Sequence, residues 1–169
     1  MQTLRADDLV LTPLVVAHAQ AMFDLLSEPG LYRYLDYAPP PTVEHLREVY
    51  ARVEKRKSPD GTQCWLNWIV SHEGEPPLGY VQVTIFQDSP ASIGYVFSSQ
   101  HWGRGYATRA MQAVLDHLPI AYGITQFTAT TEVANARSIG VLQRLGFREA
   151  SEAQLAGHHL SPTERKFFR

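Results

Sequence analysis

Residues 93–108 (IGYVFSSQHWGRGYAT) constrain the fold of this 169-residue chain more than any other segment. A run of β-branched and aromatic residues ends near Phe97 and a short loop follows. After Gly103-Arg104-Gly105 the spacing of apolar residues changes. From there apolar residues recur at the three- and four-residue spacing of one helix face. They are Ala107, Ala110, Met111, Val114, Leu115 and Leu118. The segment predicts a strand, a glycine loop and a long helix that Pro119 ends.

The glycine loop has the chemistry of an anion site. Glycine reaches backbone angles that other residues avoid, and it leaves no Cβ between the chain and a ligand. A helix start presents unpaired N–H groups and roughly half a positive charge, which suits a phosphate or pyrophosphate. Arg104 adds a side chain that can donate a charge-assisted hydrogen bond to a phosphate. Taken alone, Gly103 and Gly105 are better explained by a tight turn.

A dinucleotide-binding loop is disfavoured. Its fingerprint needs a third glycine or alanine where this chain has Thr108. It usually lies in a first β-α-β unit with an acidic residue about 20 positions later, whereas this loop follows runs that predict antiparallel strands. The sequence also lacks the lysine-serine pair of a nucleotide-hydrolysing loop.

The rest of the chain predicts a mixed sheet flanked by helices, which is an α/β fold of α+β type. Strands are expected at residues 9–14, 64–71, 78–86, 92–97 and 124–131, from 147 onward and at 164–168. Helices are expected at 17–26, at 43–53 with Thr42 as the cap, and at 135–145. Short turns join the strands between 64 and 97, so these should be antiparallel. Because no linker or repeat divides the chain, we expect one domain over residues 1–169.

A second motif follows the strand expected at 124–131. Residues 135–138 (NARS) lead into 141–147 (VLQRLGF). Together with Gln100-x-x-Gly103-x-Gly105-x-Ala107, this motif resembles the GNAT superfamily of acyltransferases. More narrowly, the chain resembles the branch that contains the ribosomal-protein N-terminal acetyltransferases. The resemblance covers nearly the whole chain.

The resemblance implies a mostly antiparallel sheet with one splayed parallel pair, formed by the strands at 93–97 and 124–131. The pantetheine arm of acetyl-CoA is expected in that gap, bonded to the backbone of residues 95–97. The N–H groups of residues 101–107 are expected around the pyrophosphate. The implied cofactor-binding residues are Val96, Phe97, Gln100, His101, Trp102, Gly103, Arg104, Gly105, Tyr106, Ala107, Thr108, Asn135 and Ser138.

The chemistry that the resemblance implies is direct attack of an amine on the thioester, without an enzyme nucleophile. A backbone N–H near Val96 or Phe97 is expected to bind the oxyanion. Ser138 and Asn135 are the expected catalytic residues, with Ser138 as the donor to the leaving sulfur and Asn135 also as a helix cap. Many members place a tyrosine acid where this chain has Leu142. The departure leaves the acid to Ser138 or to solvent.

The acceptor and the general base are open at this point. Glu132 is better explained as a solvated loop carboxylate than as a base. Asp36, among Tyr32, Tyr34 and Tyr37, is placed to hold a cationic amine, although a tyrosine cluster explains these residues equally well. A protein N-terminus, an aminoglycoside, a polyamine and an amino acid are all candidate acceptors. The alternatives are a CoA-binding sensor or scaffold without catalysis, and a nucleotide-binding regulatory domain.

Composition narrows the partners. A net charge of −2 gives no basic surface for nucleic acid. With neither a signal peptide nor a run of about 18 apolar residues, a cytoplasmic protein without a membrane partner is expected. The single cysteine, Cys64, predicts a packed thiol. Adjacent His158 and His159 would point to opposite faces of a strand, so no metal is expected. Both a monomer and a homodimer are compatible with the sequence.

Overall fold

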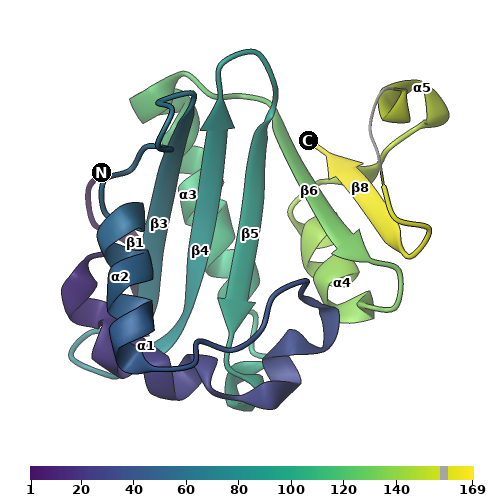
Figure 1. Cartoon of the computed structure of the whole chain (residues 1–169). Helices are drawn as coiled ribbons and strands as arrows, with labels where there is room; N and C mark the ends of the chain where they lie inside the picture. Colours follow the sequence, from purple (N-terminus) through teal and green to yellow (C-terminus); the bar gives the residue numbers. More distant parts are fainter. Residues whose placement is uncertain (157–159) are drawn as a thin grey trace.

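The computed structural model describes residues 1–156 and 160–169, in which an eight-stranded mixed sheet is flanked by helices (Figure 1). The strand order is β1-β2-β3-β4-β5-β6-β8-β7. The strands are β1 (Leu4–Ala6), β2 (Leu9–Pro13), β3 (Gln63–His72), β4 (Pro77–Phe86), β5 (Ala91–Phe97), β6 (Phe127–Glu132), β7 (Arg148–Glu149) and β8 (Glu164–Phe168). The helices are α1 (Ala19–Leu26), α2 (Val43–Val53), α3 (Tyr106–Tyr122), α4 (Ala136–Arg144) and α5 (Glu152–Leu155), with 3₁₀ turns η1 (Val16–His18), η2 (Pro29–Tyr34) and η3 (Ser99–His101). The predicted α/β fold with a mixed sheet is confirmed.

Strands β1 to β5 form a continuous antiparallel run. The expected hairpins between residues 64 and 97 are therefore confirmed. Strand β1 was not predicted, because three residues are too few to show an alternating pattern. It pairs with β2 through Leu4 and Leu11, and both side chains are buried.

The sheet changes character between β5 and β6. These strands are parallel, and their register joins only Ala91 with Phe127 and Ser92 with Thr128. Beyond those two pairs the strands separate toward their C-terminal ends (Figure 1). On its other edge β6 continues the sheet by pairing antiparallel with β8. The predicted splayed parallel pair is thus confirmed.

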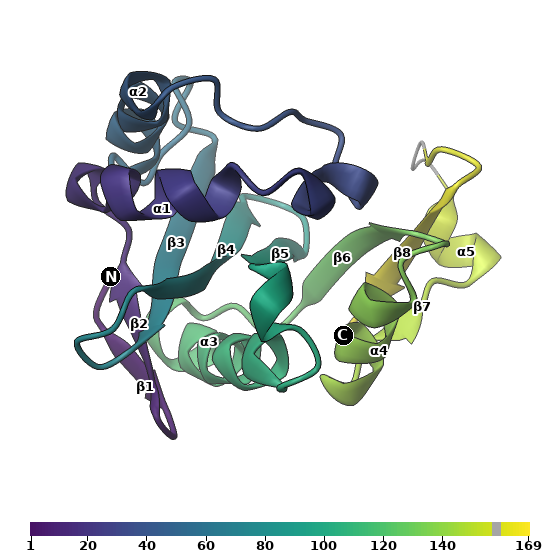
Figure 2. The same ribbon diagram turned by 90° about the horizontal axis from the view of Figure 1, so that it is seen from below.

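Helices cover both faces of the sheet. Helices α1 and α2 lie on one face and α3 lies on the other (Figure 2). Successive residues of β3 serve the two faces in turn, because side chains alternate along a strand. Trp68 and Val70 belong to the core cluster that includes α3, whereas Ile69 belongs to the cluster with α1 and α2. Residues of β5 belong to both cores, because Ile93 and Phe97 pack on the α3 side and Val96 packs on the side of α1 and α2.

Pro119 does not end α3, which corrects the expectation from the sequence. The helix continues to Tyr122 and ends at Gly123, whose φ is 70°. Proline lacks its own N–H, so the helix loses the one bond that residue 119 would have made to Leu115. The following turn still forms, and Gly123 N–H donates to Pro119 O at 3.2 Å.

Other element boundaries differ slightly from those expected. Strand β6 begins at Phe127, because the residues from 124 complete the helix end first, with Ile124 N–H donating to Leu118 O. The short helix α5 was not predicted. Cys64 is half-buried against the α3-side core, as expected, and burial raises the pKa of its thiol. His158 and His159 lie outside the described residues. No helix in the described part of the chain is long and apolar enough to cross a bilayer.

Candidate active site

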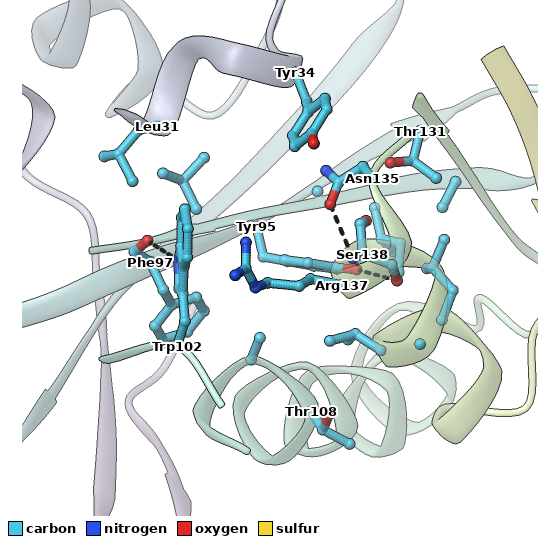
Figure 3. Close-up of a pocket in the computed structure, with 18 of the residues that line it drawn as sticks. Leu31, Tyr34, Tyr95, Phe97, Trp102, Thr108, Thr131, Asn135, Arg137 and Ser138 are labelled. Atoms are coloured by element: carbon cyan, nitrogen blue, oxygen red, sulfur yellow. Dashed lines mark hydrogen bonds between the residues drawn. The ribbon is translucent and has the colours of Figure 1, made fainter. Parts of the chain in front are cut away.

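A cavity of about 730 Å³ opens where β5 and β6 separate (Figure 3). Its walls come from β4, β5, β6, η2, the start of α3 and the length of α4. Most of the residues expected at the site line it: Val96, Phe97, His101, Trp102, Gly103, Gly105, Tyr106, Ala107, Thr108, Asn135 and Ser138. The side chains of Gln100 and Arg104 are exposed and do not line the cavity.

The first turn of α3 offers unpaired polar groups to the cavity. Gly105 is the N-cap, and no side chain caps this helix, so its first N–H groups have no partner within it. The hydroxyl of Thr108 and Nδ1 of His101 are buried without a hydrogen-bond partner among the described residues. A Cβ on Gly103 or Gly105 would meet nothing within 4 Å. The turn is therefore an open cradle of donors, which fits a phosphate.

The peptide groups of successive β5 residues face β4 and the cavity in turn. Ser98 donates its N–H to a β4 carbonyl at 3.0 Å, and this fixes which residues of the ladder are hydrogen-bonded pairs. In that phase Val96 is paired with Tyr80, so its peptide groups face β4. The peptide groups of Tyr95 and Phe97 face the splayed edge. Of the two N–H groups expected near the oxyanion, the register leaves that of Phe97 free to face a ligand.

Trp102 and Arg137 make a contact across the cavity. The indole Nε1 of Trp102 donates to Phe97 O at 2.8 Å. The Arg137 guanidinium lies over the indole ring, 4.7 Å from its centroid. Arg137 comes from the first turn of α4, so the contact joins α4 to the loop before α3 (Figure 3). The charged side chains among the described lining residues are those of Arg137 and Arg144, and their sign favours an anionic ligand.

The start of α4 brings Asn135, Ser138 and Tyr95 together. Asn135 Oδ1 accepts the N–H of Ser138 at 3.1 Å, which confirms the predicted helix cap. The phenol oxygen of Tyr95 lies 3.0 Å from Ser138 Oγ and 3.2 Å from Ser138 O, so its one proton can be donated to either oxygen. Burial raises the pKa of Tyr95 to about 12, so this phenol stays protonated near neutral pH. Leu142 also lines the cavity and is buried.

Tyrosines line the end of the cavity next to η2. They are Tyr34, Tyr37 and Tyr80, and the hydroxyls of Tyr37 and Tyr80 lie 3.0 Å apart. Burial raises the pKa of both, so they act as neutral hydroxyls. Asp36 and Glu132 lie outside the lining, so the carboxylate that the sequence placed near the entrance does not face this cavity. Within the described residues, no group of three or more His, Cys, Asp or Glu could hold a metal ion.

Sequence reasoning missed several side chains of the site, among them Arg137 and Tyr95. Arg137 stands inside the second motif, directly before Ser138, and its position there was the available signal. Tyr95 shares a strand face with Phe97, because side chains of a strand alternate with a period of two. That alternation was readable, but the partner of Tyr95 on α4 was not, since the two are far apart in sequence.

A mixed sheet splayed between two parallel strands, with two helix starts around the opening, is the arrangement that the resemblance to acyltransferases implied. The chain belongs to the GNAT acetyltransferase family, because the model of that family, described as "Acetyltransferase (GNAT) domain", matches residues 8–148. The family predicted from the two motifs is thereby confirmed.

Known proteins resemble the chain over most of its length. The uncharacterized N-acetyltransferase p20 of Bacillus licheniformis is 25% identical over 151 residues, which cover 88% of this chain and 84% of that protein. A Salmonella typhimurium acetyltransferase that modifies the N-terminal serine of ribosomal protein L7/L12 has a TM-score of 0.77 at 19% identity, covering 99% of this chain and 98% of that one. The spermidine N-acetyltransferase of Vibrio cholerae, solved with CoA and spermine, has a TM-score of 0.74 at 16% identity, covering 96% and 95%. At these identities the two structures support the fold.

Proposed function

We propose that the cavity binds acetyl-CoA and that the protein transfers the acetyl group to a primary amine. The observation that carries this proposal is the position of the cavity, between splayed strands and at the starts of α3 and α4. The unpaired donors of α3 suit the pyrophosphate, and Arg137 adds positive charge. The peptide groups of Tyr95 and the carbonyl of Phe97 suit the amides of the pantetheine arm. The Vibrio cholerae neighbour, which was solved with CoA, supports this choice of ligand.

In the proposed reaction the bound thioester supplies the acetyl group, and this chain orients and stabilises it. The amine nitrogen forms a bond to the carbonyl carbon, the carbon–sulfur bond breaks, and a proton passes overall from nitrogen to sulfur. The N–H of Phe97 donates a hydrogen bond to the developing oxyanion. The hydroxyl of Ser138 donates a hydrogen bond to the sulfur as it leaves. Asn135 holds the first turn of α4 so that Ser138 faces the cavity.

For the acceptor we propose an amine that enters at the tyrosine-lined end, either a protein N-terminus or a small molecule. The Salmonella neighbour modifies an N-terminal serine and the Vibrio neighbour was solved with spermine, so both kinds occur on this fold. An α-amino group has a pKa of about 7.7–8.0 and is partly neutral at pH 7, whereas a lysine-type amine at about 10.4 is not. Peptides with a free N-terminus are therefore the first acceptors to test.

Two measurements test the proposal. Acetyl-CoA at 100 times its dissociation constant should stabilise the protein by about 2.7 kcal/mol in a thermal shift, and NAD and ATP should not. Release of CoA thiol should then depend on an amine from a panel of peptides, amino acids, aminoglycosides and polyamines. Binding without thiol release would favour the sensor or scaffold. Stabilisation by NAD or ATP instead would favour the nucleotide-binding domain.

The proposal extends to the whole molecule. It treats residues 1–169 as one catalytic domain that uses no metal and works in the cytoplasm, where acetyl-CoA is available. Light scattering after gel filtration would distinguish a monomer from a homodimer.

A further inference from the structure

The side chains of Tyr95 and Ser138 form a hydroxyl pair across the splay. Tyr95 comes from β5 and Ser138 from the first turn of α4, so the pair joins two walls of the cavity (Figure 3). Both residues line the cavity, and their oxygens lie 3.0 Å apart. The proposed reaction uses the serine hydroxyl and leaves the phenol without a role.

The protons of this pair can be arranged in two ways. The Tyr95 phenol has one proton and two acceptors within reach, Ser138 O at 3.2 Å and Ser138 Oγ at 3.0 Å. When the phenol donates to the carbonyl, the 3.0 Å contact is a hydrogen bond only if the serine hydroxyl donates to the phenol oxygen, and that turns the serine proton away from a ligand. When the phenol donates to Oγ, the serine proton is free to reach a ligand. Only the second arrangement can serve a leaving sulfur.

We infer that Tyr95 is a positioning residue for acetyl transfer, whose phenol donates to Ser138 Oγ and so directs the serine proton to the thioester sulfur. The inference rests on the proposed function. It also explains how this chain could work with Leu142 where many family members have a tyrosine acid. Leu142 is buried and cannot donate a hydrogen bond. In this chain a phenol reaches the cavity from β5 rather than from α4. Burial raises the pKa of Tyr95 to about 12, so the donor keeps its proton through the working pH range.

The step balances without ionising either hydroxyl. The nitrogen–carbon bond forms and the carbon–sulfur bond breaks, which places the electron pair of that bond on sulfur. Ser138 donates a hydrogen bond to the sulfur, and Tyr95 donates one to Ser138, so the two bonds strengthen each other. The proton lost by the acceptor nitrogen passes through solvent and ends on the sulfur. Ser138 and Tyr95 then return to their starting arrangement.

The first test is a double-mutant cycle of Tyr95→Phe and Ser138→Ala, with thiol release as the assay. Tyr95→Phe should lower kcat about fivefold to tenfold, with the KM for acetyl-CoA changed less than twofold. Adding Tyr95→Phe to Ser138→Ala should cost little more, because the phenol acts through the serine. Tyr50→Phe is the matched control. The Tyr50 hydroxyl is buried outside the cavity lining without a partner among the described residues, so its removal should leave kcat unchanged.

The second test reads the hydrogen bond without turnover. Donors aimed at a thiolate lower the pKa of the thiol, so Tyr95→Phe and Ser138→Ala should both raise the pKa of the thiol of bound CoA. Ultraviolet absorbance of the thiolate against pH measures this, and Tyr50→Phe should match the wild type. An unchanged thiol pKa in Tyr95→Phe, or fully additive losses of kcat, would overturn the inference. If wild-type protein binds CoA but acetylates none of the amines, the proposed function fails, while the thiol titration still tests the pair.

Discussion

Gly103 and Gly105 share a φ of 77°, a conformation that strains most L-residues. An added Cβ would meet nothing at either position, so crowding within the protein does not require glycine there. The backbone angle requires it and, in the proposed function, so does the close approach of the pyrophosphate. Gly74, in the turn between β3 and β4, has nearly the same φ of 75° and equally open surroundings outside the cavity. Gly74 is therefore a matched control for substitutions at Gly103 and Gly105.

Gly103→Asp should weaken acetyl-CoA binding by more than tenfold, about 1.4 kcal/mol. The substitution adds a negative charge and a side chain where the pyrophosphate is expected. Gly74→Asp carries the same charge and the same backbone strain, so it should lower stability similarly and leave affinity unchanged. Calorimetry and thermal unfolding on both variants give the comparison. Equal affinities in Gly103→Asp and Gly74→Asp would show that the cofactor binds elsewhere.

Arg137→Gln should weaken acetyl-CoA binding roughly tenfold and make it less sensitive to salt. The guanidinium over Trp102 is the charge placed across the cavity, and a charge-assisted hydrogen bond contributes about 1.5–3 kcal/mol. Affinity measured at low and high salt tests both parts, because screening weakens charge interactions. Arg52→Gln, at the exposed end of α2, is the control. If the affinities of the two variants for acetyl-CoA respond alike to salt, then only the net charge of the protein, and not the position of Arg137, affects binding.

At the scale of elements, α2 and α4 begin in the same way. Thr42 Oγ1 accepts the N–H of His45, and Asn135 Oδ1 accepts the N–H of Ser138, each at 3.1 Å. Both caps satisfy a backbone donor that the helix leaves unpaired. The two helix starts have different surroundings, because α4 opens into the cavity and α2 does not.

Thr42→Ala and Asn135→Ala should each lower the free energy of unfolding by about 1 kcal/mol, the usual contribution of a cap. Only Asn135→Ala should also lower kcat, since it loosens the turn that carries Ser138. Asn135→Asp keeps the cap acceptor and should retain stability. Urea unfolding together with thiol release separates the two effects. A loss of kcat in Thr42→Ala as large as in Asn135→Ala would mean that general stability, rather than the turn, controls the rate.

The sequence predicts the long elements well because their signals are local. Spacing and residue type alone predict the apolar stripe of α3, the strands β3 to β5 and the side-chain caps Thr42 and Asn135. Strand β1 and helix α5 are too short to show a period. The end of α3 was wrong because a proline in the last turns costs one bond, and packing and the Gly123 cap outweigh it.

Within the site, the glycine cradle, Asn135 and Ser138 are part of two contiguous motifs, and this is why they could be predicted. Tyr95 and Arg137 depend on contacts made only after folding: the phenol with Ser138, and the guanidinium with Trp102. The hydrogen-bonding phase of β5 decides whether the N–H of Val96 or that of Phe97 faces the cavity. It also has no sequence signal. It follows from the pairing with β4.

At the scale of the whole molecule, a group of tyrosines makes stability depend on alkaline pH. Burial raises the pKa of Tyr32 to about 12 and also raises that of Tyr50 and Tyr80. An unfolded tyrosine ionises near pH 10, so above that pH the unfolded chain loses protons that the folded protein keeps. Stability from these groups is complete below pH 10 and is lost as the pH rises toward the folded values.

The free energy of unfolding should therefore fall steeply from about pH 10 upward. Each such tyrosine contributes at most about 1.4 kcal/mol per pH unit, so Tyr50→Phe should make the fall shallower while leaving stability at pH 8 intact or higher. Urea midpoints of both proteins from pH 8 to 11 test this. Parallel urea-midpoint curves for the two proteins would assign the alkaline loss to other tyrosines, such as Tyr32 and Tyr80.

The two residue pairs that join β5 to β6 also bear on product release. Beyond these two pairs, β5 and β6 are not paired with each other. The strands β1 to β5 lie on one side of this gap and β6, β8 and β7 lie on the other. If the amides of a pantetheine arm bond to the peptide groups of Tyr95 and to the carbonyl of Phe97, the substrate supplies hydrogen bonds along this edge and each departing CoA removes them. The ladder would then be rebuilt once per catalytic cycle. The amide hydrogen of Tyr95 would exchange with water at the pace of product release rather than of unfolding.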